Sequence, residues 1–217
     1  MNDSGFYRIV CDQGHETNLF LQDEKFEILF DLGALALIDG YTREAVSSFV
    51  ASLERFYEFI IQVFLDKNGI NHSEFESTWK QVKNQSERQL GAFYFLYLNE
   101  FKQAPPVVSQ KWIEFRNNVI HKGYIPNYSE TYDYGMYLYG FMKQILMKIK
   151  EEYSENVINI GFNRQRIAHE KYSPTTPVAV TAISKMFEMV LGDELFNEKT
   201  YEKSLEQLKL RPGLYTK

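Results

Sequence analysis

Apolar residues recur at helical spacing through the middle of the chain, and the longest such run predicts a long amphipathic helix. It follows Thr42, a residue type that favours the N-cap position, and it ends at Asn68-Gly69. Its apolar positions, which step by three and four residues, are Ala45, Phe49, Leu53, Phe56, Ile60 and Phe64. That spacing places them on one face, so we expect this face to be buried against other helices.

Shorter runs of the same kind lie on both sides of this helix. We expect helices over about residues 23–38, 90–101, 109–121 and 129–153, and a short one through Trp79 that opens with a capping box of Ser73 and Glu76. Their ends are marked by Asp39-Gly40, Pro105-Pro106, Gly123 and Pro126. Because the connections are short, the natural architecture is an antiparallel helical bundle.

The two ends of the chain lack this clear helical period. Residues 1–22 mix short apolar and polar stretches, which form either a small hairpin or an arm. After Tyr153, residues 156–162 alternate weakly, as in a strand or an extended linker, and helices are expected over about 178–191 and 199–208. The predicted fold is all-α, with an N-terminal arm over 1–22, the bundle over 23–153, and a helical appendage over 154–217 packed on the bundle.

Composition fits a globular protein with a core of large side chains. The chain is 44% hydrophobic, 24% charged and 16% aromatic, and the aromatic residues fill either the core or a partner interface. The single cysteine, Cys11, excludes an internal disulfide and suits a reducing compartment. No secretory signal is recognised, and no apolar run approaches the roughly 20 residues of a membrane span, so we expect a cytoplasmic protein without a membrane partner.

The net charge limits how the protein can bind nucleic acid. At −5, the protein has no general attraction for phosphate backbones. Any RNA contact is therefore expected in a confined, locally basic cleft. The four histidines lie far apart without paired ligand spacing, so neither a metal site nor a cofactor is expected.

Residues 112–124 carry the most informative pattern. On a helical wheel, one apolar arc contains Trp112, Ile113, Phe115, Val119 and Ile120, and Arg116 falls in its middle. A cation on a buried face is costly unless it is paired. Arg116 is therefore either half of a structural ion pair, with Glu54 or Glu58 as the carboxylate, or an anion site whose guanidinium holds a phosphate through two hydrogen bonds.

His121 follows Arg116 by five residues, which places it about 140° away on an ideal helix. The two side chains can act together only if the helix ends near His121, as Gly123 suggests, or if a second subunit completes the site. Otherwise a histidine at a helix C-terminus is more often a cap. The same spacing recurs at Arg164 and His169, which we interpret as a pair on the surface or in a loop.

The context of the first pair resembles the HEPN family. The run R-N-N-V-I-H at 116–121 follows an aromatic-rich helix and precedes Lys122-Gly123, and the segment DGYTREAVSSFVASLERFYEFII looks like the long early helix of these domains. In that family an Arg-x(4–6)-His motif lies on the penultimate long helix of a four- or five-helix bundle. The resemblance covers about residues 23–153.

The resemblance implies a metal-independent endoribonuclease, a hydrolase that acts in phage defence or as a toxin and works as a homodimer with a composite active site. Arg116, Asn117 and His121 would be catalytic, and Lys122 and Tyr124 would contact the RNA. His121 would move the proton of a 2′-hydroxyl or of the leaving 5′-oxygen, and Arg116 would stabilise the charge on the phosphate. A cognate regulatory partner is also compatible with the family.

One departure from the family pattern keeps a second interpretation open. Some HEPN toxins carry, two residues after the histidine, a tyrosine that accepts a nucleotide; here that position is Gly123, and the tyrosine follows at Tyr124. This departure and the acidic charge favour a non-catalytic HEPN-like dimerisation module that binds a nucleotide or a protein. A helical interaction protein unrelated to the family is the third alternative.

Overall fold

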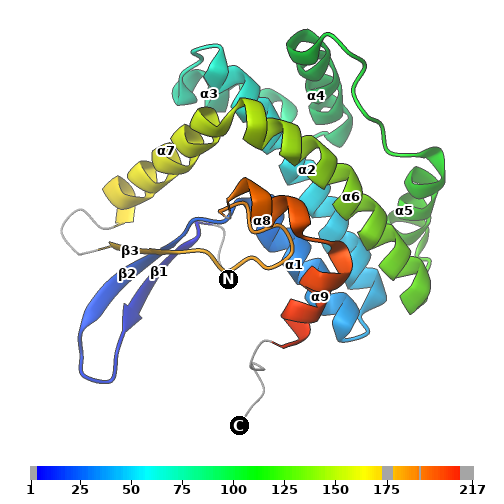
Figure 1. Cartoon of the computed structure of the whole chain (residues 1–217), viewed down its shortest axis with the longest axis horizontal. Helices are drawn as coiled ribbons and strands as arrows, with labels where there is room; N and C mark the ends of the chain where they lie inside the picture. The colour runs from blue at the N-terminus through cyan, green and yellow to red at the C-terminus, as the bar shows by residue number, and fades with distance from the viewer. Residues whose placement is uncertain (1–3, 173–177, 191, 211–217) are drawn as a thin grey trace.

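The computed structural model describes residues 4–172, 178–190 and 192–210, and over these ranges the chain is mostly helical with a small three-stranded sheet (Figure 1). The helices are α1 (Lys25–Ile38), α2 (Thr42–Lys67), α3 (His72–Val82), α4 (Ser86–Phe101), α5 (Gln110–Lys122), α6 (Tyr128–Glu152), α7 (Ser154–Tyr172), α8 (Asp193–Glu198) and α9 (Tyr201–Lys209). The strands are β1 (Phe6–Val10), β2 (Glu16–Leu21) and β3 (Val178–Thr181). None of the described helices combines the length and apolarity needed to cross a bilayer.

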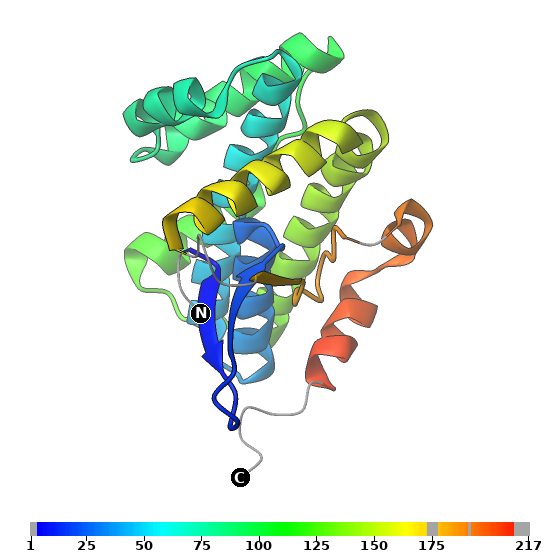
Figure 2. The same ribbon diagram turned by 90° about the vertical axis from the view of Figure 1, so that its left-hand side faces the viewer.

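Helix α2 is the centre of the helical assembly, because α1, α3, α4, α5, α6 and α7 all contact it. Its predicted apolar stripe is confirmed: Phe49, Phe56, Ile60 and Phe64 have no exposed surface. The aromatic residues of neighbouring elements meet this stripe, with Phe30 4.7 Å from Phe49 between ring centroids. The prediction of a core filled with large side chains is therefore confirmed as well. Figure 2 shows α3 and α4 together at the opposite end of the molecule from α9.

The helix ends agree with the predictions in part. Gly123 follows α5 with a φ of 73°, a conformation that glycine adopts without steric cost, as predicted. Thr42 is the first residue of α2 rather than its N-cap. The capping box of Ser73 and Glu76 is wrong, because Asn71 caps α3 through its side-chain oxygen, which accepts from the N–H of Glu74 at 3.0 Å.

The N-terminal segment forms a hairpin, one of the two alternatives for it. β1 and β2 pair antiparallel, and β3 adds to β2 in parallel, with Asn18 opposite Val178. The helix expected over 178–191 is therefore wrong for the described residues of that range. The sequence Val-Ala-Val-Thr favours a strand, and the open edge of β2 gives it a partner that no local pattern reveals.

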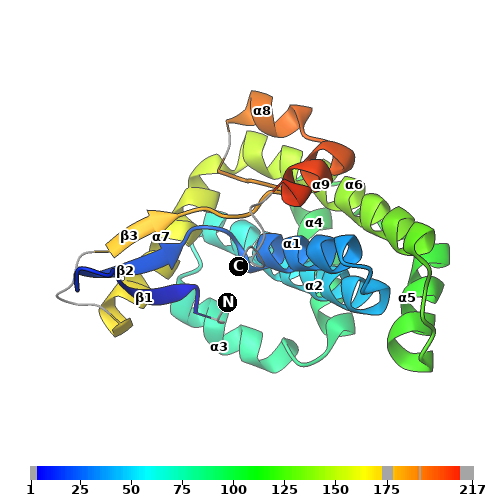
Figure 3. The ribbon, with the colours of Figure 1, turned by 90° about the horizontal axis from the view of Figure 1, so that it is seen from below.

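Residues 156–162 are also not a strand or linker but part of α7. Val157 and Ile160 pack against the core, whereas Ile158 and Phe162 are exposed. Over this short segment, the order of apolar and polar residues resembles the alternation of a strand. The helical period becomes apparent only when the segment is followed to residue 172. The sheet and α5 lie at opposite ends of the molecule (Figure 3).

Three carboxylates on one side of the start of α1, which we call the carboxylate ladder, hold the segment that follows β3. Asp23, Glu27 and Asp31 stand four residues apart, and each is at most 5% exposed. The backbone N–H groups of Ile183 and Ser184 donate to Asp23, those of Lys185 and Met186 to Asp31, and that of Met189 to Glu27, at 2.7–3.0 Å. Because this segment has no regular partner for its buried N–H groups, the carboxylates supply the acceptors.

Candidate functional site

Helix α5, which carries the predicted catalytic residues, lies at the edge of the helical assembly. Val119 is fully buried, whereas Ile113 is 38% exposed. The rings of Trp112 and Phe115 lie 5.5 Å and 5.2 Å from Tyr134 of α6, which fixes α5 against that helix. The apolar arc is thus only partly covered, and Arg116 sits where the covered surface meets the open one.

Arg116 is half-buried and forms the ion pair considered from the sequence, with Glu54 as its partner. One guanidinium nitrogen lies 3.6 Å from the Glu54 carboxylate, and a second donates to the side-chain oxygen of Asn117 at 3.0 Å. Glu58, the other carboxylate considered, pairs with Arg55 instead. A distance of 3.6 Å is too long for a hydrogen bond, and arginine has five N–H donors. The guanidinium of Arg116 therefore has N–H groups that can still bind an anion.

Tyr134 completes a polar cluster where α2, α5 and α6 meet. It is 2% exposed, and burial raises its pKa, while the nearby Arg116 lowers it and Glu54 raises it. The cluster of Glu54, Arg116, Asn117 and Tyr134 therefore combines a cation, a carboxylate, an amide and a phenol. The side chain of Arg116 is 26% exposed, so the cation is accessible from solvent.

His121 and Lys122 form the last turn of α5, and both are exposed. The N–H of Tyr124 donates to the carbonyl of Asn118 at 3.1 Å, so the backbone itself satisfies the helix end. Within the described part of the chain, no hydrogen bond involves the His121 ring, and His121 is not a cap. Arg116 faces α2 while His121 is open to solvent, and no hydrogen bond joins the two in one chain.

Tyr124, the second predicted RNA contact, is held at the start of α6. Its hydroxyl donates to the Glu130 carboxylate at 2.9 Å, and this hydrogen bond raises the pKa of Tyr124. Glu130 in turn forms the capping box of α6 with Asn127. Although the phenol is 43% exposed, its hydroxyl is already engaged.

The second Arg–His pair, interpreted from the sequence as surface or loop, lies in helix α7, and only its histidine is exposed. Arg164 lies in α7, pairs with Glu24 at 2.6 Å and donates to the carbonyl of Gln22 at 2.6 Å, so it ties α7 to the start of α1 and to the residue after β2. His169 is exposed one turn further on. The interpretation is corrected for Arg164, because its partners come from segments distant in sequence.

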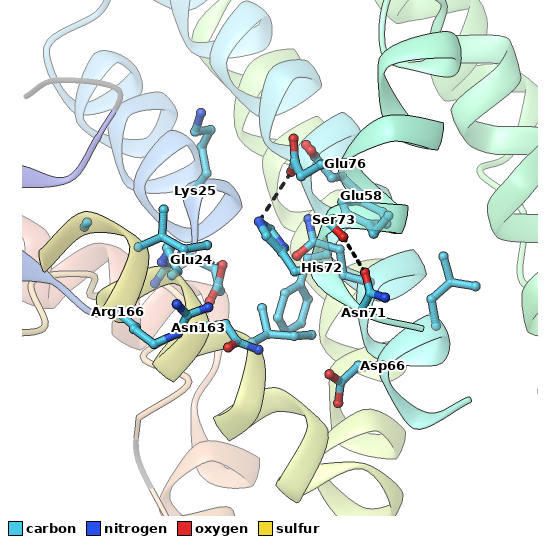
Figure 4. Close-up of a pocket in the computed structure, with 18 of the residues that line it drawn as sticks. Glu24, Lys25, Glu58, Asp66, Asn71, His72, Ser73, Glu76, Asn163 and Arg166 are labelled. Atoms are coloured by element: carbon cyan, nitrogen blue, oxygen red, sulfur yellow. Dashed lines mark hydrogen bonds and ion pairs between the residues drawn. The ribbon is translucent and has the colours of Figure 1, made fainter. Parts of the chain in front are cut away.

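A groove of about 780 Å³ lies away from α5, between the start of α1, α2, α3 and α7 (Figure 4). Sequence reasoning missed it because its walls come from segments far apart along the chain. Among the described residues, no group of three or more His, Cys, Asp or Glu side chains is arranged to hold a metal ion.

Comparison of the sequence with protein-family models and with curated proteins, and of the structure with solved structures, finds no match.

Proposed function

We propose that this protein is a metal-independent endoribonuclease of the HEPN type, a cytoplasmic enzyme of phage defence or a toxin. The observation that carries the proposal is the end of α5, where a partly exposed Arg116 and an exposed His121 lie on one helix. An arginine with unused donors can stabilise charge on the phosphate, and an exposed imidazole can act as the general base or acid of phosphodiester cleavage without metal.

The chemistry follows from these side chains. Neutral His121 takes the proton of the 2′-hydroxyl, the 2′-oxygen attacks phosphorus, and the bond from phosphorus to the 5′-oxygen breaks. A protonated imidazole or water returns a proton to the 5′-oxygen. Arg116 stabilises the charge that builds on the phosphate oxygens, and Asn117 positions its guanidinium through the 3.0 Å hydrogen bond. The products are a 2′,3′-cyclic phosphate and a 5′-hydroxyl.

A homodimer would bring the two groups together. Within one chain, Arg116 faces Glu54 of α2, whereas His121 is exposed at the helix end. Because α5 lies at one end of the molecule (Figures 1 and 3), two copies can place this helix end to face its symmetry mate. Arg116 of one protomer would then meet His121 of its partner across the RNA, with Lys122 close to the phosphates.

A second function is favoured by one observation, the contact between Arg116 and Glu54. If Arg116 serves only to form this ion pair, its role is to hold α5 against α2. The protein is then a non-catalytic module that binds a nucleotide or a protein. The two functions differ in what the loss of Arg116 changes: RNA cleavage in the first, only folding stability in the second.

The test is cleavage of mixed cellular RNA by purified protein in EDTA. We expect Arg116→Ala and His121→Ala each to lower the rate by about a hundredfold or more, since positioned acid–base groups and donors that stabilise developing charge each contribute on that order. Arg43→Ala and His169→Ala remove the same residue types from exposed positions of α2 and α7 and should leave the rate unchanged. Wild-type products should end in cyclic phosphate.

Two outcomes oppose the nuclease. A well-folded dimer that leaves RNA intact would favour the binding module. Cleavage that survives both substitutions in α5 would assign the activity to a contaminant or to a different site.

A further inference from the structure

The groove between α1, α2, α3 and α7 has an apolar base and a polar rim. Phe26, Phe59 and Phe75 line it and are at most 5% exposed, and Ile160 adds apolar surface from α7. Its volume of about 780 Å³ falls within the range of pockets that hold small molecules. An apolar base alone would bind almost any apolar compound, so the polar rim must determine which ligand is selected.

The charges on that rim are divided between its two sides. Lys25 and Arg166 lie on the side formed by α1 and α7, and Glu58, Asp66 and Glu76 lie on the side formed by α2 and α3 (Figure 4). Arg55 also lines the groove from α2, where it pairs with Glu58, so the uncompensated charges of this side are Asp66 and Glu76. Lys171, a further lining residue, adds positive charge to α7. The groove therefore presents an electrostatic gradient from one wall to the other.

One carboxylate stands on the basic side, and its charge is compensated. Glu24 pairs with Arg164 at 2.6 Å, and burial raises the pKa of Glu24 while Arg164 lowers it. On the acidic side, Asp66 accepts a hydrogen bond from Asn156 at 2.8 Å, which leaves its charge in place. Pairing within the walls thus preserves the asymmetry.

The rim groups are held by contacts that a ligand can replace. Arg166 pairs with Glu170 at 2.9 Å, with both side chains more than half exposed, and His72 lies 4.0 Å from Glu76. Exposed pairs of this kind contribute little, about 0–1 kcal/mol. Within the described residues, the side-chain amides of Gln62 and Asn163 make no hydrogen bond. They therefore offer hydrogen-bond donors and acceptors to a ligand from opposite walls of the groove.

Glu58 already has a cationic partner on the acidic side, because Arg55 pairs with it at 2.5 Å. Burial raises its pKa, Arg55 and Lys25 lower it, and Glu76 raises it again. Glu76, whose side chain is 45% exposed and lies 4.0 Å from His72, is a carboxylate on this side that a positive group of a ligand can reach. An ammonium group can pair with this carboxylate and can donate up to three hydrogen bonds.

We propose that this groove binds a zwitterionic small molecule, with its anionic group on the Lys25 and Arg166 side and its ammonium group on the Glu76 side. The anion is a carboxylate or a phosphate, and the apolar base receives the uncharged body of the ligand. The inference does not rest on the nuclease, because none of the groove residues belongs to α5.

The test is an NMR titration of ¹⁵N-labelled protein with matched probes. Leucyl-leucine supplies a carboxylate and an ammonium, and glucosamine 6-phosphate supplies a phosphate and an ammonium, so the two arms separate the anions. N-acetyl-leucyl-leucine lacks the ammonium, and leucyl-leucine amide lacks the carboxylate. We expect at least one zwitterion to shift the backbone signals of His72 and Asn163, and we expect the matching single-charge compounds to bind about tenfold more weakly, as the loss of one charged hydrogen bond predicts.

Two variants assign the ends of the ligand. Glu76→Gln should weaken zwitterion binding and leave the acetylated compound unchanged, while Arg166→Gln should weaken both. Arg166 is exposed and the side chain of Glu76 is 45% exposed, so the fold is retained, and Glu87→Gln with Arg43→Gln serve as exposed controls. The proposal is overturned if neither zwitterion shifts the groove signals, or if their affinity is the same in all variants.

Discussion

At the residue scale, the position of Arg116 shows how far sequence reasoning reaches. A cation in the middle of an apolar arc had to find a carboxylate or an anion, and the structure supplies Glu54 at 3.6 Å. The wheel could not choose between Glu54 and Glu58, since both lie on α2 and the choice depends on how α5 packs against it. Likewise, nothing local to α5 predicts that Tyr134 closes the cluster.

The ion pair leads to a first prediction, for Glu54→Gln. If Arg116 acts on phosphate, this change frees the guanidinium, so RNA cleavage should be retained or increased. Both side chains are partly exposed, so the free energy of unfolding should fall by no more than about 1 kcal/mol. Cleavage assays and urea titrations measure the two quantities. Loss of cleavage in a folded variant would instead show that Glu54 is needed to position Arg116.

A second prediction concerns Glu27 of the carboxylate ladder. Burial raises its pKa from 4.5 to about 8, although the N–H groups of Met189 and Glu24 lower it. Because the folded-state pKa is the higher one, the stabilisation from the bound proton is complete below about pH 4.5 and is lost as the pH rises through about 8. The free energy of unfolding should therefore decrease across this window.

Urea titrations at a series of pH values measure that slope. Glu27→Gln cannot ionise, so its slope should be shallower than that of the wild type, while the exposed control Glu87→Gln should match the wild type. An unchanged slope in Glu27→Gln would mean that Glu27 does not carry the titration.

At the scale of elements, the long helices were predictable, and so was the last helix, expected over about 199–208 and observed as α9, whereas α7 and β3 were not. The apolar residues of α2 recur at helical spacing over enough turns to predict this helix, and Gly123 marks the end of α5. By contrast, β3 exists because β2 offers an edge, and the residues after β3 are shaped by carboxylates 160 residues away, as between Asp23 and Ile183. The walls of the groove likewise meet only in the fold.

The third prediction tests how firmly the segment after β3 is docked. Phe187 has no exposed surface, and its ring lies 5.0 Å from those of both Phe30 and Tyr139. Phe187→Ala should cost about 3–5 kcal/mol of unfolding free energy, because it leaves a cavity in the aromatic core. Leu195→Ala, at a site 59% exposed, should change it by less than about 0.5 kcal/mol. Equal effects would show that this segment is only loosely attached.

At the scale of the whole molecule, the proposed composite site makes a fourth prediction. Arg116→Ala and His121→Ala proteins, each inactive alone, should regain activity when unfolded together and refolded as a mixture. Half of randomly paired dimers then contain one intact site of two, so about a quarter of wild-type activity is expected. Light scattering reports the dimer independently. No recovery from a mixture of dimers would mean that both groups act within one chain.

The pairing of β3 with β2 also has a consequence for synthesis. A ribosome delivers the hairpin and α1 first, and the strand and peptide that cover them arrive only with residues 178–189. Until then, the edge of β2 and the aromatic face that receives Phe187 are open to other chains. This fold is therefore vulnerable to aggregation in the interval before residues 178–189 are made, when α1 to α7 have already been synthesised.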